Sequence, residues 1–160
     1  VYWAVSDKRS IPSPVSNVTI LNRLDPVDLS SDPESVNAGG TSGFAGMNLA
    51  ILKRSRLIIL LGFDYCASKK GGWHFCEEQY VKKRAQNIPS WMVWAGYYDR
   101  IVPKLASLGV TVINASERST IKSLPKRSID ESIILGMDWL RQKRAGCVCS
   151  GTELVDAELQ

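Results

Sequence analysis

Apolar residues are distributed along the chain in runs and in regular spacings that predict strands and helices. Residues 57–63 show no polar alternation, which is typical of a strand covered on both faces in a parallel sheet. Residues 110–114 predict a second internal strand of this kind. Shorter apolar runs at residues 1–5 and 18–21 suit strands as well. The pattern therefore predicts strands both near the N-terminus and in the middle of the chain.

Three segments repeat their apolar positions at spacings of three and four, which predicts helices. The first covers residues 42–54, and the second covers residues 91–108, where Pro103 is expected to kink or split the helix. The third begins at the capping box of Ser128 and Glu131. Its apolar positions are Ile133, Ile134, Met137 and Leu140. Residues 25–40, rich in Asp, Ser, Pro, Asn and Gly, predict a long acidic connection before the first helix.

The order of these elements indicates the fold class. Helix, buried strand, helix and strand in succession are typical of βαβ units, whose strands lie parallel in one sheet. We therefore expect an α/β fold, namely a three-layer Rossmann-like domain with a mainly parallel sheet. A chain of 160 residues has room for one such core. We assign residues 1–146 to this single domain and expect residues 147–160 to form a flexible C-terminal tail.

Composition narrows the class of protein. Hydrophobic residues make up 44% of the chain and charged residues 22%, which excludes disordered and collagen-like proteins. The longest apolar run is far shorter than the roughly 20 residues that span a bilayer. No signal-type segment precedes the first strand, so we expect a cytoplasmic protein, and the missing initiator Met suggests a processed or partial chain. The net charge of +4 is a weak basic excess, and nucleic-acid binding is not expected.

The cysteines do not predict a disulfide framework. Cys66, Cys76, Cys147 and Cys149 are irregularly spaced and include no Cys-x-x-Cys pair, so we interpret them as reduced thiols. Cys147 and Cys149 could hold half of a metal site. A closed zinc site needs four ligands, however, and the only histidine of the chain, His74, is distant in sequence. No metal is expected, and the role of the two C-terminal cysteines stays open.

A glycine-rich turn leads directly into the first predicted helix. Its backbone amides and the positive end of the helix dipole are suited to holding a phosphate, and its hydroxyls add donors. The residues that we assign to this phosphate site are Gly40, Thr41, Ser42 and Gly43. The turn lacks the Lys of a P-loop and the spacing of a dinucleotide fingerprint. A Ser N-cap after a flexible turn is the structural alternative.

Three further segments follow predicted strands or loops where ligands collect in parallel sheets. Asp64, next to Tyr65, ends the central strand and could hold a ribose hydroxyl, a metal or a helix N-terminus. His74 lies between two aromatic residues and could act as a general base, because the pKa of histidine is near neutrality. Simple packing is the alternative for His74. The polar loop at residues 114–119 could close over a nucleotide base or merely cap a turn.

As a set, several of these segments resemble a family of uncharacterised phage and prophage proteins. That family is similar to single-domain, Rossmann-like bacterial sialyltransferases and to archaeal pterin diphosphokinase-like proteins. The resemblance covers the chain from about residue 37 to residue 131. Its segments are residues 37–44 (Asn-Ala-Gly-Gly-Thr-Ser-Gly-Phe), 48–50 (Asn-Leu-Ala), 58–64 (Ile-Ile-Leu-Leu-Gly-Phe-Asp), 73–74 (Trp-His), 109–114 (Gly-Val-Thr-Val-Ile-Asn), 119 (Ser) and 124–125 (Leu-Pro).

The sialyltransferase resemblance implies a nucleotide-sugar donor, with a cytidine nucleotide preferred, and inverting transfer to a hydroxyl. In that pattern Thr41 and Ser42 match the turn that holds the donor phosphates, and Asp64 matches the Gly-x-Asp after the central strand. His74 falls in the loop that supplies the catalytic base. Tyr65 is one residue away from a phosphate-binding tyrosine, and Ser119 lies in the turn that lines the nucleotide.

The chain departs from this pattern at its beginning. Family members start with a strand and a Gly-Pro-Ser type loop, whereas residues 1–7 resemble a later strand, so the N-terminal βαβ unit is expected to be absent. An apolar face exposed by that absence would favour a homo-oligomer. The leading hypothesis is a phage-associated glycosyltransferase-like protein in the host cytoplasm that needs no cofactor. The alternatives are a catalytically silent nucleotide-binding accessory protein and diphosphokinase-like phosphoryl transfer.

Overall fold

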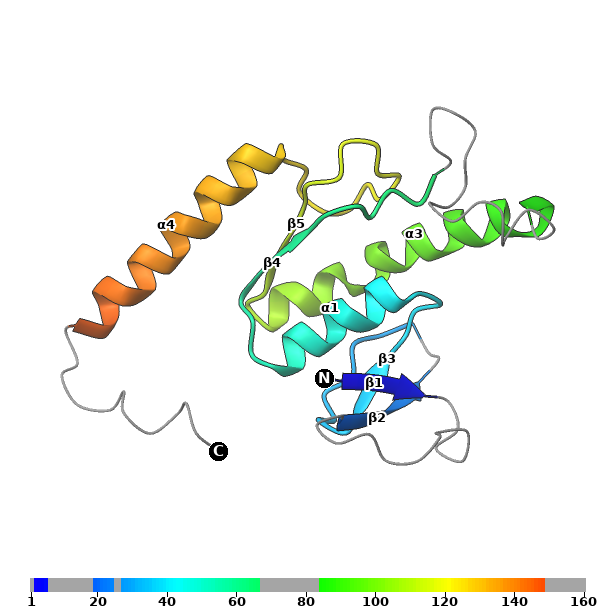
Figure 1. Cartoon of the computed structure of the whole chain (residues 1–160), viewed down its shortest axis with the longest axis horizontal. Coiled ribbons are helices and arrows are strands. Elements are labelled where there is room, and N and C mark those ends of the chain that lie inside the picture. The colour runs from blue at the N-terminus through cyan, green and yellow to red at the C-terminus, as the bar shows by residue number, and fades with distance from the viewer. Residues whose placement is uncertain (1, 6–18, 25–26, 67–83, 149–160) are drawn as a thin grey trace.

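The structure of the protein is a computed structural model, which describes residues 2–5, 19–24, 27–66 and 84–148 (Figure 1). Within these residues it is a small α/β fold with short parallel sheets and three helices. The elements in chain order are β1 (Tyr2–Val5), β2 (Thr19–Leu24), β3 (Ser35–Asn37), α1 (Ser42–Leu52), β4 (Leu57–Leu60), α3 (Arg84–Ser107), β5 (Thr111–Asn114) and α4 (Ile129–Val148). The expected α/β class is confirmed, and the three-layer Rossmann-like arrangement stays a prediction.

The strands form two separate parallel sheets. The first has the order β1-β2-β3, and the second pairs β4 with β5, with Ile59 opposite Ile113. The segment β4-α3-β5 is a βαβ unit, as the order of apolar segments predicts. Figure 1 shows α1 and α3 between the two sheets, with α1 in contact with β3 and α3 in contact with β5. Each sheet is therefore covered by a helix, the first by α1 and the second by α3.

Strand β3 lies inside the segment that the sequence predicts to be a loop, so that prediction is wrong for residues 35–37. All three residues of β3 are buried. Asn48 on α1 explains the burial of this polar strand, because its Oδ1 accepts hydrogen bonds from the amides of Asn37 at 2.8 Å and Ser30 at 3.1 Å. A buried polar backbone is stable only when such partners are present. Asn48 of α1 thus supplies the hydrogen-bond acceptor for two backbone amides in the segment around β3.

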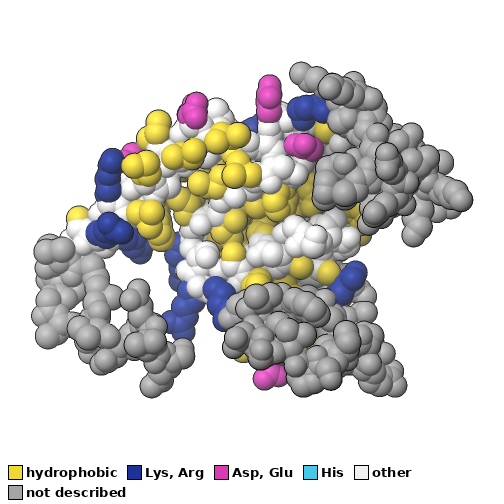
Figure 2. Space-filling view, in the orientation of Figure 1, with side chains coloured by type: hydrophobic (Ala, Val, Ile, Leu, Met, Phe, Trp, Pro, Cys, Tyr) yellow, Lys and Arg dark blue, Asp and Glu magenta, His cyan; other side chains and the backbone are white. Residues whose placement is uncertain are grey.

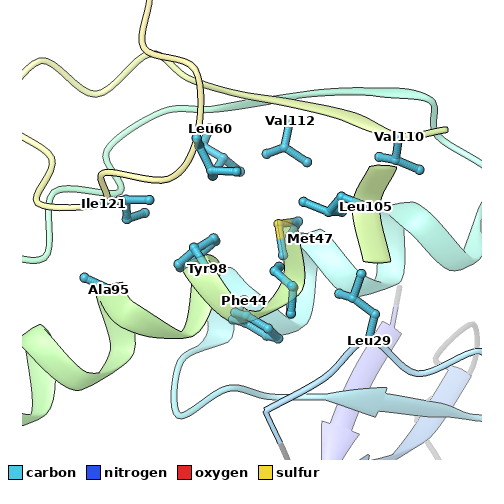
Figure 3. Close-up of a cluster of buried hydrophobic side chains, with 12 residues drawn as sticks. Leu29, Phe44, Met47, Leu60, Ala95, Tyr98, Leu105, Val110, Val112 and Ile121 are labelled. Atoms are coloured by element: carbon cyan, nitrogen blue, oxygen red, sulfur yellow. The ribbon is translucent and has the colours of Figure 1, made fainter. Parts of the chain in front are cut away.

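The main core lies between the two helices and the β4–β5 sheet (Figure 3). Phe44 of α1 and Tyr98 of α3 are both fully buried, and their rings meet edge to face with centroids 5.4 Å apart. The side chains around this pair include Met47, Leu60, Leu105, Val110, Val112 and Ile121. Burial of each large side chain contributes about 1.5–3 kcal/mol. The core therefore fixes the start of α1 against the middle of α3.

Helix α3 begins earlier than its predicted start and passes through Pro103 without being split. Proline within a helix costs about 3 kcal/mol, because one hydrogen bond is lost and the ring crowds the preceding turn. Ile101 and Leu105, on either side of Pro103, are 1% and 4% exposed. Their burial offsets that cost, which the local pattern alone does not reveal. Of the two outcomes that Pro103 predicts, a kink or a split, the split does not occur.

Helix α4 begins at the predicted capping box, which is confirmed. Ser128 Oγ accepts from the Glu131 amide at 3.2 Å, and Glu131 Oε2 accepts from the Ser128 amide at 2.9 Å. The helix lies against β4 at Gly136, where an added Cβ would be 3.6 Å from Ile59 Cδ1. None of the helices among the described residues is long and apolar enough to cross a membrane.

Candidate functional site

The glycine-rich turn before α1 is folded tightly, and two of its glycines are required by geometry. Gly39 and Gly40 have φ values of +49° and +74°, in the left-handed region that favours glycine. A Cβ on Gly39 would overlap the ring of Phe44, and a Cβ on Gly40 would overlap the indole of Trp94. Gly40 therefore lets Trp94 pack directly on the backbone of the turn.

Thr41 is the N-cap of α1. Its backbone is extended, with φ −140° and ψ 148°, and its Oγ1 accepts a hydrogen bond from the Phe44 amide at 3.2 Å. The Ser N-cap predicted as the structural alternative for this turn is wrong by one residue. Ser42 is instead the first residue of the helix. The Ser42 and Gly43 amides belong to the first turn, where an α-helix provides no acceptor for them.

A pocket of about 320 Å³ lies beside the start of α1. Gly40, Thr41 and Ser42 form its polar side. Its other side comes from β2 and β3 and from the body of α1, including Leu21, Arg23, Val36 and Leu49. Leu21 and Arg23 are two residues apart on β2 and therefore share one face of the sheet, and Val36 is the strand partner of Arg23. The pocket thus combines an aliphatic wall with a few polar groups.

The electrostatics of this pocket favour an anion. The N-terminus of α1 carries a partial positive charge, and its first turn has no acidic residue to cancel it. Arg23 of β2 is the cationic residue of the pocket lining, and it is exposed. Guanidinium groups bind phosphate oxygens in a bidentate manner. The site is therefore suited chemically to a phosphate attached to a group that packs on Leu21 and Val36.

A chain of hydroxyl groups runs from the pocket into the core. The Tyr65 hydroxyl is 3.0 Å from Thr41 Oγ1 and 3.1 Å from the Tyr98 hydroxyl. Tyr98 is fully buried, and its burial raises the pKa of its phenol well above the usual value. Tyr98 therefore stays protonated at physiological pH and can donate to Tyr65. This chain connects α1, the segment after β4, and α3.

Asp64 lies in the segment after β4, and Ser119 lies in the loop after β5. Hydrogen bonds join these two segments. Ser119 Oγ donates to the Phe63 carbonyl at 2.6 Å, while Ser116 Oγ accepts from the Phe63 amide at 2.7 Å. The Thr120 amide donates to the Asp64 carbonyl at 2.9 Å. Because these bonds join backbone to loop, Ser119 has a clear positioning role in this structure.

The predicted site residues therefore divide into four groups. Gly40, Thr41 and Ser42 line the pocket, and Tyr65 contacts it through Thr41. Gly43 supports the turn, because an added Cβ would be 2.8 Å from the Phe63 ring. Like Gly43 and Tyr65, Asp64 and Ser119 are not part of the pocket lining. His74, the predicted base, lies outside the described residues, as does Cys149.

Arg23, Trp94 and Tyr98 contribute to the site but are not among the site residues that the sequence predicts. Arg23 is a single cation in a short strand, and its only local signal is its spacing of two from Leu21. Trp94 and Tyr98 fit the apolar spacing of the helix predicted at residues 91–108. Their contacts with Gly40 and Tyr65 join segments far apart in the chain, so no local motif could reveal them.

No protein-family model, curated protein or solved structure matches this chain. The resemblance to phage proteins and sialyltransferases therefore stays a prediction from the sequence. A shared fold would in any case leave the function to be argued from the site.

Proposed function

We propose that the protein is a phage-associated, glycosyltransferase-like protein with a Rossmann-like fold that binds a nucleotide-sugar donor at the start of α1. The observation that carries the proposal is the pocket of about 320 Å³ between Ser42 and Arg23. Its volume falls within the range of small-molecule sites, at the lower end. The parallel βαβ unit of β4, α3 and β5 supports the fold part of the proposal.

In this proposal the donor phosphates lie at the first turn of α1. The amides of Ser42 and Gly43 and the Ser42 hydroxyl donate to phosphate oxygens, and Arg23 neutralises their charge. Thr41 positions the turn, because its Oγ1 already accepts from the Phe44 amide and is bonded to Tyr65. The aliphatic wall of Leu21 and Val36 accommodates the less polar part of the nucleotide.

Transfer then proceeds by attack of an acceptor hydroxyl on the anomeric carbon of the sugar. The new bond forms between the acceptor oxygen and that carbon, and the bond from the carbon to the phosphate oxygen breaks. The departing nucleotide takes the electron pair and is stabilised by the positive first turn of α1 and by Arg23. His74 accepts the proton of the acceptor hydroxyl, the role that the sialyltransferase resemblance implies.

A binding protein without catalysis is the second candidate, and one observation favours it. Among the described residues that line the pocket, Arg23 is the sole ionisable side chain, and arginine does not act as a base at neutral pH. Binding by these residues alone would give affinity for a nucleotide but no proton transfer. The two candidates therefore differ in turnover and agree on the pocket.

A thermal-shift panel tests the binding step that both candidates share. Cytidine, uridine, guanosine and adenosine diphosphates and the corresponding nucleotide sugars are added with and without magnesium. A ligand at about 100 times its Kd stabilises the folded state by about 2.7 kcal/mol. We expect metal-independent stabilisation by a cytidine nucleotide. An adenosine nucleotide that requires magnesium would instead indicate phosphoryl transfer, and no shift with any nucleotide would overturn the proposal.

Variants then locate the binding and separate it from catalysis. Arg23→Gln and Ser42→Ala should reduce the nucleotide-induced shift, whereas Arg100→Gln, on the exposed side of α3, should leave it unchanged. The unliganded melting temperature of each variant controls for stability. His74→Ala should abolish sugar transfer and retain the shift. Retained turnover in His74→Ala would remove His74 from the mechanism, and binding without turnover in the unaltered protein would favour the second candidate.

A further inference from the structure

Helix α4 exposes an unusually large apolar surface. Ile129, Ile133, Met137 and Leu140 are each between 49% and 53% exposed, and Ile134 is 59% exposed. The first four recur at spacings of four, four and three, so they form one stripe along the helix. Single exposed apolar residues are common, but a contiguous stripe marks an interaction surface. We call these four residues the α4 stripe.

Among the described residues, the elements around α4 leave the α4 stripe about half exposed. The helix faces the body of the protein with Ser132, which is buried, and with Gly136, whose added Cβ would be 3.6 Å from Ile59. The stripe lies on an adjacent flank of the same helix. Figure 1 shows α4 extending away from α1 and α3, and Figure 2 shows hydrophobic side chains along its visible side. A partner can therefore approach the stripe without moving the core.

The charges of α4 indicate which partner fits. Acidic residues Asp130 and Glu131 lie in its first turn, and three basic residues lie at positions 141–144, just before its last turn. The basic residues are Arg141, Lys143 and Arg144. Asp130 and Arg144 are equally far from Met137 in the sequence. A second α4 in the antiparallel direction therefore presents the opposite charge at each end.

We propose that the α4 stripe is a homodimer interface, in which two α4 helices pack antiparallel about a two-fold axis near Met137. Each Asp130 then approaches Arg144 of the partner subunit, and the isologous arrangement satisfies both ends at once. The antiparallel helix dipoles also attract each other. In a parallel pair, Asp130 would face Asp130 of the partner subunit, and Arg144 would face Arg144 of the partner subunit. Repulsion between these like charges opposes the parallel arrangement.

This inference is independent of the proposed function, because none of its residues lines the pocket at the start of α1. An α4 of 20 residues is about 30 Å long, so the shared surface is that of one helix pair. We therefore expect a reversible dimer whose population depends on protein concentration.

Light scattering coupled to size-exclusion chromatography measures the mass of the 160-residue chain over about a hundredfold range of concentration. We expect the mass to rise from 17.7 kDa toward twice that value. Met137→Glu should keep the protein a monomer, because the two introduced carboxylates would be buried against each other at the two-fold axis of the dimer. Gln142→Glu, a matched control on the exposed face of α4, should leave the dimer intact. Circular dichroism establishes that both variants remain folded.

A charge exchange tests the antiparallel direction and remains informative if Met137→Glu fails to fold. Asp130→Lys and Arg144→Glu should each raise the dissociation constant of the dimer by about tenfold or more, because like charges then face each other. Mixing the two single variants, or combining both changes in one chain, should restore dimerisation. A monomer at every concentration, a dimer unaffected by Met137→Glu, or a combined variant no tighter than the single ones would overturn the proposal.

Discussion

Tyr65 and Tyr98 face each other with their hydroxyl oxygens 3.1 Å apart, although they lie on different sides of a long connecting segment. Tyr65 also has a left-handed backbone, with φ +50°. The pair joins the segment after β4 to α3, and Tyr65 continues the contact to Thr41 at the N-cap of α1. The start of α1 is therefore held by a hydroxyl chain as well as by apolar packing.

Removal of one hydroxyl from this pair should be costly. Tyr65→Phe takes away the partner of the buried Tyr98 hydroxyl, and an unsatisfied buried donor costs about 1–3 kcal/mol. We expect urea unfolding to show a loss of stability of this size. Tyr65→Phe/Tyr98→Phe should lose less than the sum of the single variants, because no donor is then left without a partner. Strict additivity would show that the two hydroxyls do not interact.

Asn48 should be a second critical residue. It is fully buried, and besides accepting from the amides of Ser30 and Asn37 it donates from Nδ2 to the Ser30 carbonyl at 3.2 Å. Asn48→Leu keeps the branched shape of the side chain but leaves these backbone groups unsatisfied. We expect a loss of about 3 kcal/mol or more in the free energy of unfolding, from about 1–3 kcal/mol for each group.

The control for Asn48 is Gln142→Leu on the exposed face of α4, which should change stability by no more than about 0.5 kcal/mol. Hydrogen exchange locates the effect of Asn48→Leu. The amides of Ser30 and Asn37 should lose protection in this variant. Unchanged protection of both amides would contradict the role assigned to Asn48.

Local signals predicted the elements whose stability depends on their own residues. Strands β4 and β5 were visible as apolar runs, and the start of α4 was visible because Ser128 and Glu131 satisfy each other. Strand β3 was missed because its partners, strand β2 and the Asn48 side chain that binds the Asn37 amide, lie outside the segment. Pro103 does not split α3, and the burial of Ile101 and Leu105 that offsets its cost is a property of the whole core.

The candidate site divides in the same way. The turn at Gly40 and Thr41 could be predicted, because left-handed glycines and an N-cap leave a local sequence signature. Arg23 and Tyr98 could not be predicted as site residues. Each lies on an element that is far from the turn in sequence and comes near it only in the folded structure. Strand register and helix packing decide such neighbours, and neither can be derived from one segment.

Low pH should weaken the fold through carboxylates that accept hydrogen bonds. Hydrogen bonds from the Ser35 hydroxyl and then from the Glu34 amide lower the pKa of Asp32 below its ordinary value of 3.8. The hydrogen bond from Lys104, followed by that from the Leu29 amide, lowers the pKa of Asp28. A carboxylate whose pKa is lowered in the folded state stabilises the fold at pH values above its pKa in the unfolded state. This stabilisation is lost as the pH falls through its pKa in the folded state.

The urea midpoint should therefore fall as the pH drops below about 4. Asp32→Asn should show a lower midpoint than the unaltered protein at pH 7 and a smaller decline on acidification. Asp138→Asn is the control, because that carboxylate lies in an exposed pair with Arg141 on α4. A decline of the same size in Asp32→Asn and in the unaltered protein would mean that Asp32 contributes nothing to the pH dependence.

Gly40 and Gly62 allow the strain of a left-handed residue to be separated from a steric clash. Their φ values are +74° and +73°, so alanine would have a left-handed backbone at both positions. A Cβ at Gly62 would meet nothing within 4 Å, whereas a Cβ at Gly40 would overlap the indole of Trp94. Gly62→Ala should therefore cost only the conformational strain of about 1–2 kcal/mol.

Gly40→Ala should cost this strain and a further amount of about 1–3 kcal/mol, because Trp94 must move away from the turn. Urea unfolding measures both variants. Relative to the Trp94→Ala single variant, the combination of Trp94→Ala with Gly40→Ala should lose only the strain, since the overlap is then absent. Equal losses in Gly40→Ala and Gly62→Ala would show that Trp94 does not pack on the turn. The pocket wall at the start of α1 would then lack the support that this contact gives it.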